Sequence, residues 1–218
     1  MSEESWFASV PKTLASVGPS TTFQSTVLVC DIRGFTQLLE KTTPEDAFQF
    51  IEKFLHSLTL AVIQEGGSVN NLTGDGFLAQ FGIGLFDDSH ALRAVNCAIE
   101  LRQRLQKLNR ELHIARDTTF RIGIGLHSGV IAGGHVQLGH FSSFLIVGDT
   151  INVAARIESL TKDFAVDILL SSATFDKVKD HHKFMPMAPR AVKGKSEMLA
   201  TYWIPPQAKT LRNYILEI

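Results

Sequence analysis

A short hairpin lying between two long amphipathic helices restricts the possible folds of this chain most strongly. Residues 68–82, SVNNLTGDGFLAQFG, place an Asp-Gly pair between alternating apolar residues. Such a pair indicates a tight β-hairpin, because glycine supplies the positive φ that the turn requires. Before it, apolar residues recur at a period of 3.6 over residues 44–65, behind an N-cap at Thr43. After it, the same period predicts a second helix within residues 87–112.

Two strand-like segments complete this unit. Residues 25–31, STVLVCD, form an apolar run rich in β-branched residues, and residues 119–129, TFRIGIGLHSG, alternate as a strand does. The resulting order, β-α-β-β-α-β, is that of a ferredoxin-like sheet. Additional C-terminal strands and helices are expected, chiefly at 141–148, 149–163, 166–171 and 201–204. The sequence therefore predicts an α+β fold with a mostly antiparallel sheet and helices on one side of it.

Composition narrows the domain organisation and the functional classes. With 218 residues, 44% of them hydrophobic, the chain can bury a core as one domain. We expect this domain at 25–204, after a loosely ordered lead-in at 1–24 and before a C-terminal extension at 205–218. The net charge of -1 disfavours binding to nucleic acid. The acidic N-terminus and the lack of an apolar run of about 20 residues predict a cytoplasmic chain without a membrane anchor.

Two acidic residues stand where strands end. Asp31 closes the first strand and Asp75 lies in the turn of the hairpin, and a ferredoxin-like sheet puts these strands side by side. Neighbouring carboxylates provide the oxygen ligands that two Mg²⁺ or Mn²⁺ ions need. The glycine in IRGFT, directly after Asp31, lets successive backbone N–H groups approach a phosphate chain. Alone, each feature also fits ordinary strand and turn chemistry; together they predict a nucleoside triphosphate site.

Five motifs carry a resemblance to a known family. They are VCDIRGFTQLLE, TGDGFLAQF, GIGLHSGVIAGG, VGDTINVAARIESL and VKGKSEMLATYWI. Their order and approximate spacing resemble those of class III nucleotidyl cyclase catalytic domains, the adenylate and guanylate cyclases. The resemblance extends over about residues 25–204. Five ordered motifs are more specific than any one of them.

The resemblance implies a role for particular positions. Asp31 and Asp75 match the two metal-binding aspartates, and the backbone carbonyl of Ile32 would be a further metal ligand. Asn152 and Arg156 resemble the pair that stabilises the transition state, and because they stand four residues apart they share one helix face. The positions that would bind the phosphates are Gly34, Phe35, Thr36 and Lys193.

The resemblance also implies a reaction and an assembly. In such cyclases the ribose 3′-oxygen attacks the α-phosphate, pyrophosphate leaves, and two divalent cations promote the transfer. The site lies between two subunits: one supplies the aspartates, and the other supplies the Asn, the Arg and the base contacts. Because this chain holds both sets, we expect a homodimer with two equivalent sites. A nucleotide-binding regulatory module without turnover is the alternative from another class, and it fits less well because neither set is lost.

The base-reading positions depart from the family pattern. Four residues before Asp75, where adenylate cyclases usually carry Lys and guanylate cyclases Glu, this chain has Asn71. Seven residues before Asn152, in place of Asp or Thr, it has Leu145, preceded by Phe144. The amide of Asn71 can pair with adenine, uracil or cytosine by flipping, so hydrogen bonding leaves these bases open.

Two further features favour a pyrimidine. Phe144 and Leu145 occupy space and so favour a smaller ring, and the chain has no recognisable sensor domain or membrane helices. It thus resembles small stand-alone bacterial cyclases of anti-phage systems, which make cyclic UMP or cyclic CMP for a separate effector protein. We therefore expect a pyrimidine nucleotide cyclase that uses UTP ahead of CTP. An adenylate cyclase that makes cyclic AMP is the alternative.

Overall fold

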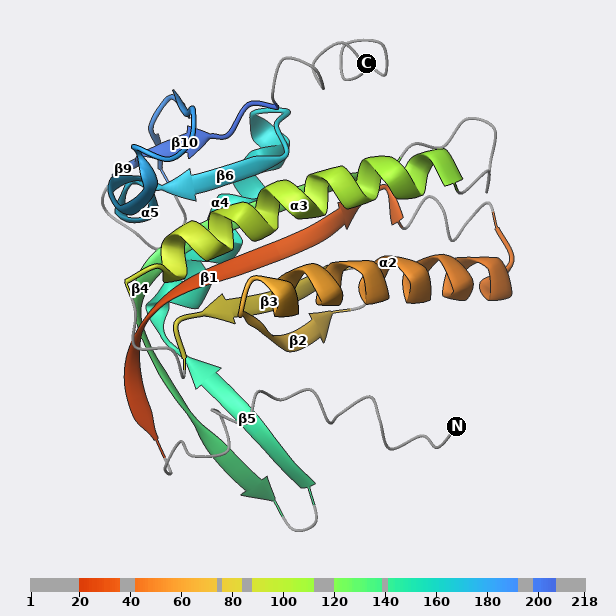
Figure 1. Cartoon of the computed structure of the whole chain (residues 1–218), viewed down its shortest axis with the longest axis horizontal. Coiled ribbons are helices and arrows are strands. Elements are labelled where there is room, and N and C mark those ends of the chain that lie inside the picture. Colours follow the sequence, from red (N-terminus) through yellow and green to blue (C-terminus); the bar gives the residue numbers. More distant parts are fainter. Residues whose placement is uncertain are drawn as a thin grey trace.

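The computed structural model of the chain describes residues 20–35, 42–73, 76–83, 88–111, 120–138, 141–191 and 198–206 (Figure 1). The longer strands are β1 (Thr21–Arg33), β2 (Ser68–Thr73), β3 (Gly76–Phe81), β4 (Arg121–Leu138), β5 (Phe141–Val147) and β6 (Ile168–Ser171). The short strands are β7 (Met185–Pro186), β8 (Arg190–Ala191), β9 (Met198–Leu199) and β10 (Thr201–Trp203). The helices are α2 (Pro44–Gln64), α3 (His90–Glu111), α4 (Asp149–Asp163) and α5 (Ser172–Val178).

The main sheet has the expected ferredoxin-like centre. Its strand order is β2-β3-β1-β4-β6-β10-β7, with β5 paired to β4 beside this path. The first four strands in this order, together with α2 and α3, form the predicted β-α-β-β-α-β unit. β4 and β6 pair in parallel, and the other described pairs of the sheet are antiparallel. The α+β fold with a mostly antiparallel sheet is therefore confirmed.

β1 begins earlier than the sequence indicated. Its first residue is Thr21, inside the segment that we expected to be a loosely ordered lead-in. Residues 21–24 pair with residues 130–133 of β4, which is itself a long strand. The expectation of a lead-in is thus wrong for residues 21–24, because β4 continues far enough to offer them ladder partners. Residues 1–19 lie outside the described part of the chain.

The sheet carries helices on both faces, which corrects the expectation of helices on one side (Figure 1). Ile122, Ile124 and Leu126 of β4 belong to the main core with α2 and α3. A Cβ on the alternate residues Gly123 and Gly125 would instead collide with α4. Because successive side chains of a strand point to opposite faces, α4 covers the face that α2 and α3 leave open.

Gly125 brings α4 into backbone contact with β4. A Cβ at this position would collide with the carbonyl of Ala154 and the amide of Glu158. Backbone atoms cannot move aside as a side-chain tip can, so any side chain here would push the helix away from the sheet. A glycine in the interior of a strand often marks such a close approach of another backbone. The depth at which α4 lies is therefore set by the strand beneath it.

The helix boundaries follow their local signals. The Thr43 hydroxyl accepts a hydrogen bond from the Asp46 amide at 3.2 Å, as an N-cap does, and Pro44 opens α2. Gly66, with φ of 68°, follows the last turn. No helix in the described ranges combines the length and the apolar composition needed to cross a membrane.

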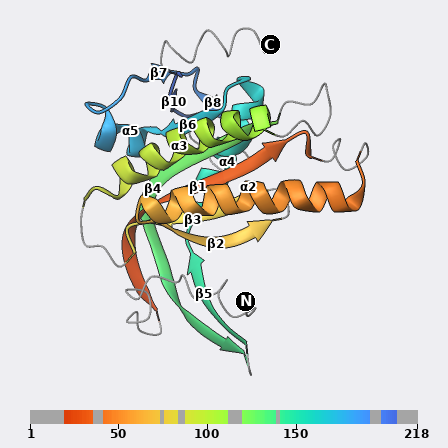
Figure 2. The ribbon, with the colours of Figure 1, turned by 45° about the vertical axis from the view of Figure 1, so that its right-hand side comes forward.

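β4 and β5 form an arm that extends away from the rest of the sheet (Figure 2). The arm consists of residues 132–138 of β4 paired with β5. Its apolar side chains are partly directed to solvent: Val136, Leu145 and Val147 are all exposed. The arm returns toward the sheet so that β5 also contacts β2. β5, which carries Phe144 and Leu145, is thereby brought near β2, the strand that carries Asn71.

Candidate active site

Asp31 lies near the end of β1 on the face covered by α4. Its ladder partners are Gly76 on β3 and Gly123 on β4. Neither partner has a side chain; the space above Gly123 is taken by Glu158 and Thr161 of α4, and the Asp31 carboxylate is half-buried. Gly76 is the residue that follows Asp75 in the chain, and Asp75 itself lies outside the described residues. A half-buried carboxylate between two glycines is a fitting ligand for a small hard cation.

Glu158 of α4 is a second carboxylate beside Asp31. A Cβ at Gly123, the ladder partner of Asp31, would collide with a carboxylate oxygen of Glu158. Burial first, and then the neighbouring Asp31 carboxylate, raise the pKa of Glu158 from 4.5 to about 7, against the lowering effect of Arg33 and Lys162. The two carboxyl groups are therefore close enough to interact, and a cation bound beside Asp31 would favour the charged form of Glu158.

The residues after Asp31 divide between the core and the surface. The side chain of Ile32 is buried in the main core, so its contribution to a metal could come only from the backbone carbonyl. Gly34 is exposed and has a φ of 81°, which an L-residue rarely adopts. Phe35 is buried in the same core and anchors the turn. Of the other expected phosphate contacts, Thr36 and Lys193 lie outside the described residues.

Asn152 and Arg156 both lie on α4, on the side turned away from the sheet. Asn152 is exposed and Arg156 is half-buried. The Nη1 atom of Arg156 is buried and has no hydrogen-bond partner among the described residues. Buried donors are nearly always paired in folded proteins, so an unused guanidinium nitrogen points to an acceptor supplied from elsewhere.

α4 separates the two groups of expected site residues. Two residues along an α-helix correspond to a rotation of about 200°, so Arg156 and Glu158 lie on opposite flanks of α4. The Glu158 flank faces Asp31 of the same chain. The Arg156 flank, which also holds Asn152, faces the other way. Within one chain, the structure brings Asp31 and Glu158 together and keeps Arg156 apart from them.

The base-reading residues come from β2 and β5. Asn71 is exposed and lies opposite Leu78 on β3, just after an irregularity in the β2–β3 register. Leu78 packs against the same small apolar cluster as Phe144 of β5, which includes Ile131 and Ile146. Because Asn71 and Leu78 are ladder partners, their side chains lie on one face of the sheet. The structure therefore places Asn71 and Phe144 on a common face.

Leu145 has a different orientation from Phe144. Consecutive side chains of β5 point to opposite faces, so these two cannot line the same wall of one pocket. Phe144 packs over Gly133, where a Cβ would come within 2.9 Å of the ring, and against the ring of His135 at 5.2 Å. Leu145 is 54% exposed on the other face of the arm.

Arg33 and Glu158, the charged neighbours of Asp31, were not expected from the sequence. Arg33 belongs to the IRGFT stretch and Glu158 to the motif that contains Arg156. The available signal was the pair of alternating glycines in RIGIGL, since Gly123 and Gly125 indicate that another element packs closely at that point. Identifying that element as α4, and the contact as Glu158, required the tertiary structure.

Comparisons with known proteins show the family of this chain. Residues 19–206 match the family described as the adenylate and guanylate cyclase catalytic domain. An adenylate cyclase of Anabaena cylindrica is 32% identical over 193 residues, covering 85% of this chain and 38% of that protein. Adenylate cyclase 1 of Rhizobium meliloti is 29% identical, with 81% of this chain and 27% of that protein covered. The chain thus spans well under half the length of these curated relatives.

Solved structures share the fold. The adenylyl cyclase CyaB from P. aeruginosa has a TM-score of 0.79 at 25% identity, with 87% of this chain and 97% of that chain covered. A dimeric guanylyl cyclase domain of the RhoGC fusion protein from Blastocladiella emersonii has a TM-score of 0.72 at 25% identity, with 84% and 97% covered. The guanylate cyclase domain of RhGC from Catenaria anguillulae, solved with GTP, has a TM-score of 0.72 at 26% identity, with 85% and 98% covered. On the family match and the shared fold, the chain belongs to the adenylate and guanylate cyclase catalytic domain family.

Proposed function

We propose that this chain is a nucleotidyl cyclase that converts a nucleoside triphosphate to a 3′,5′-cyclic nucleoside monophosphate and pyrophosphate at a site completed by a second copy. The observation that carries the proposal is the division made by α4. Glu158 faces Asp31 of its own chain, whereas Arg156 lies on the opposite flank with a buried donor that has no partner among the residues the structure describes. In a dimer with a two-fold axis, Asp31 of one chain can face Arg156 of the other, and the symmetry produces two equivalent sites of this kind.

The residues around Asp31 fit a divalent cation. The half-buried Asp31 carboxylate, with the Glu158 carboxyl group beside it, supplies oxygen ligands for such an ion. Asp31, the Ile32 carbonyl and Asp75 would hold two Mg²⁺ or Mn²⁺ ions. Bound there, the ions would lower the pKa of the ribose 3′-hydroxyl and neutralise the leaving phosphates.

The remaining residues position the substrate and stabilise developing charge. The positive φ of Gly34 turns the chain sharply after Asp31 and Arg33, which lets backbone N–H groups approach the phosphates together with Thr36 and Lys193. The free Nη1 of Arg156 donates to the phosphate oxygens as their charge builds, and Asn152, one helical turn before it, orients the same group. Because these contacts are stronger in the transition state than before it, they accelerate the reaction.

A mixing experiment tests the shared site. Asp31→Asn and Arg156→Ala should each abolish most product formation alone. Mixed in equal amounts, they should regain about a quarter of the wild-type activity, because half of the dimers are mixed and each of these has one intact site. Circular dichroism and gel filtration serve as the controls for fold and assembly. A mixture as inactive as its components would contradict the shared site.

We infer a pyrimidine triphosphate, UTP ahead of CTP, as the substrate. Phe144 fills space on the face that Asn71 shares, which favours a smaller base. Leu145 lies on the opposite face of β5, at the position where adenylate cyclases usually carry Asp or Thr, and brings no acceptor for an exocyclic amine. A buried amine left unpaired costs about 1–3 kcal/mol. The product would act as a signal for a separate effector protein, as in the anti-phage cyclases that the chain resembles.

Product analysis decides the base. The purified protein is incubated with Mg²⁺ or Mn²⁺ and each of ATP, GTP, CTP and UTP, and the products are separated by chromatography and mass spectrometry. Cyclic UMP as the main product supports the inference, and a clear preference for ATP refutes it. No product from any nucleotide would favour a regulatory nucleotide-binding module.

A double variant tests the base preference further. Asn71→Lys with Leu145→Asp installs the residues that adenylate cyclases usually carry at these positions. The added acceptor should raise the preference for ATP over UTP by about 5- to 150-fold, the equivalent of 1–3 kcal/mol. Val147→Asp, an equally exposed neighbour on the same strand, controls for a general effect of charge on the arm. Adenylate cyclase activity is the second candidate function. It is supported by the sequence identity of this chain to two bacterial adenylate cyclases.

A further inference from the structure

We propose that Arg33 is a positioning residue for the reaction proposed above, on which this inference rests: its guanidinium fastens the Asp31-bearing end of β1 to the last turn of α4. Arg33 stands two residues after Asp31 on β1, so both side chains lie on the face that α4 covers. By holding this strand end in one place, the tether fixes where the Asp31 carboxylate lies.

Two hydrogen bonds form the tether. The Nη2 atom of Arg33 donates to the Thr161 hydroxyl at 2.6 Å and to the Val166 carbonyl at 2.6 Å. Thr161 is buried in the last turn of α4, and its hydroxyl in turn donates to the carbonyl of Glu158. The guanidinium therefore lies at the C-terminal end of the helix, where the helix dipole favours a positive charge.

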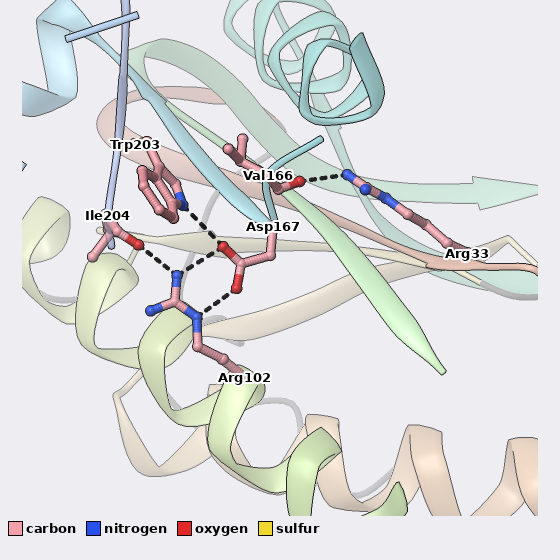
Figure 3. A network of polar contacts seen from close by, with 6 residues as sticks. All are labelled: Arg33, Arg102, Val166, Asp167, Trp203 and Ile204. Atoms are coloured by element: carbon pink, nitrogen blue, oxygen red, sulfur yellow. Dashed lines mark hydrogen bonds and ion pairs between the residues drawn. The ribbon is translucent and has the colours of Figure 1, made fainter. Parts of the chain in front are cut away.

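The tether is attached to a rigid anchor (Figure 3). Val166 precedes Asp167, whose carboxylate is held by Arg102 at 2.5 and 2.8 Å and by the Trp203 indole at 3.1 Å. The backbone carbonyl of Asp167 accepts a bond from the Ile124 amide of β4 at 2.7 Å. Contacts to α3, β4 and β10 thus immobilise the turn that receives Arg33. Because this turn cannot move, the bond from Arg33 to Val166 holds the end of β1 in place.

The local charges explain why a tether is required. The carboxyl groups of Asp31 and Glu158 lie beside each other on the face that α4 covers, and like charges at such a separation repel. Arg33 also lies directly opposite Arg121 across the β1–β4 ladder, and like charges in this relation are destabilising. Directly after Arg33 the chain turns at the exposed Gly34. The Arg33–Arg121 pair is the last of the β1–β4 ladder. Without the tether, these repulsions would act on a strand end that no further ladder hydrogen bond holds.

Three variants separate the tether from its charge. Arg33→Met removes both charge and tether, Arg33→Lys keeps the charge but loses the planar fork, and Thr161→Val keeps Arg33 but removes one acceptor. Binding of Mn²⁺ alone, without nucleotide, is measured by electron paramagnetic resonance on the full chain. We expect Arg33→Met and Thr161→Val to weaken Mn²⁺ binding about 10-fold, with Arg33→Lys between them and the wild type. Turnover should fall through kcat rather than through KM for the nucleotide.

Arg104 provides the matched control. It is also half-buried and also binds a neighbouring element, through the Ser57 carbonyl at 3.0 Å and the Gln64 side chain at 2.8 Å on α2. Arg104→Met should lower the melting temperature while leaving Mn²⁺ binding as in the wild type. This control distinguishes a positioning role from a general loss of stability.

The outcomes are distinguishable. If Arg33→Met and Thr161→Val bind Mn²⁺ as the wild type does and only melt earlier, Arg33 has a structural role alone and the proposal is overturned. If Arg33→Met binds Mn²⁺ more tightly and Thr161→Val is unchanged, Arg33 acts as a charge and the tether is overturned. If Asp31→Asn binds Mn²⁺ like the wild type, or the wild type does not bind it, the metal assignment in the proposed function fails and the positioning role fails with it.

Discussion

Two arginines of this molecule, Arg102 on α3 and Arg156 on α4, are placed in opposite ways. Arg102 is buried and well paired: it contacts Asp167 through Nε at 2.5 Å and through Nη2 at 2.8 Å, and Nη2 also donates to the Ile204 carbonyl at 2.6 Å (Figure 3). Arg156 is half-buried, and its buried Nη1 has no hydrogen-bond partner within the described part of the chain. One guanidinium is satisfied by its own fold, and the other keeps a donor available.

The difference separates a residue that stabilises the fold from one that we assign to the reaction. A buried charge is tolerated when its partner charge and hydrogen bonds come from the same chain. An unused donor beside the surface costs stability, and such a cost is expected where a ligand supplies the missing acceptor. Variants of these residues, and of the carboxyl groups near them, test the contrast through their effects on stability and on turnover.

Arg102→Met should show the largest effect on stability. It leaves the Asp167 carboxylate buried without its partner charge, and breaking a buried pair in this way costs about 3–5 kcal/mol. Urea denaturation followed by circular dichroism measures the loss. The double variant Arg102→Met, Asp167→Leu should recover most of it, because no charge then remains buried. A loss below about 1 kcal/mol in the single variant would contradict the structural role.

Arg156→Ala should leave stability nearly unchanged and reduce turnover. Removing one preorganised donor to a developing negative charge typically slows a reaction about 10²- to 10³-fold. Initial rates with the preferred triphosphate, measured beside a urea denaturation curve, give both quantities. If the variant retains near-normal rates, or if it unfolds as readily as Arg102→Met, the contrast between the two arginines does not hold.

Glu158→Gln tests the corresponding contrast between carboxylates, since Asp167 has an arginine partner and Glu158 faces another carboxylate. The folded-state pKa of Glu158, about 7, lies above its ordinary 4.5, so between these values the folded chain binds more protons than the unfolded one. The protonated Glu158 carboxyl contributes to the free energy of unfolding. This contribution is fully present below pH 4.5 and is lost as the pH rises through 7. Gln does not titrate. The melting temperature of the variant minus that of the wild type should therefore be larger at pH 8 than at pH 5.

The measurement for Glu158→Gln is thermal unfolding at both pH values with a chelator present, so that no divalent cation compensates the carboxylates. Ser159→Ala, at an exposed neighbouring position on the same helix, serves as the control and should show no such change with pH. An equal difference in melting temperature at pH 5 and pH 8 would indicate that Glu158 titrates normally.

Ala165→Gly should have the smallest effect, and a stabilising one. Ala165 has a φ of 51° in the turn between α4 and Asp167, a conformation that costs an L-residue about 1–2 kcal/mol and glycine almost nothing. After the greater flexibility of glycine in the unfolded chain is subtracted, about 0.5–1 kcal/mol remains. Urea denaturation measures it. A destabilised variant would mean that the Ala165 side chain contributes packing that outweighs the strain.

Much of the fold was accessible from sequence because its signals are local. The Thr43 cap, the glycines that end α2 and the alternation in β1 and β4 each act within a few residues, and the predicted order of elements from β1 to β6 is the observed one. The extent of β1 was missed, because residues 21–24 become a strand only through pairing with a distant segment. The position of α4 was missed for the same reason, since Gly125 does not reveal which helix it contacts.

Periodicity and motif spacing were enough to expect Asp31 at a strand end, Asn152 and Arg156 four apart on a helix, and Asn71 and Leu145 where the family carries other residues. The positions of Arg33 and Glu158 around Asp31, and of Arg156 on the far flank of α4, became known from the folded structure alone. These two kinds of information differ in the distance along the chain over which they act. Caps, turns and periodicity depend on neighbours in the chain, whereas charge pairing and helix depth depend on groups that only folding brings together.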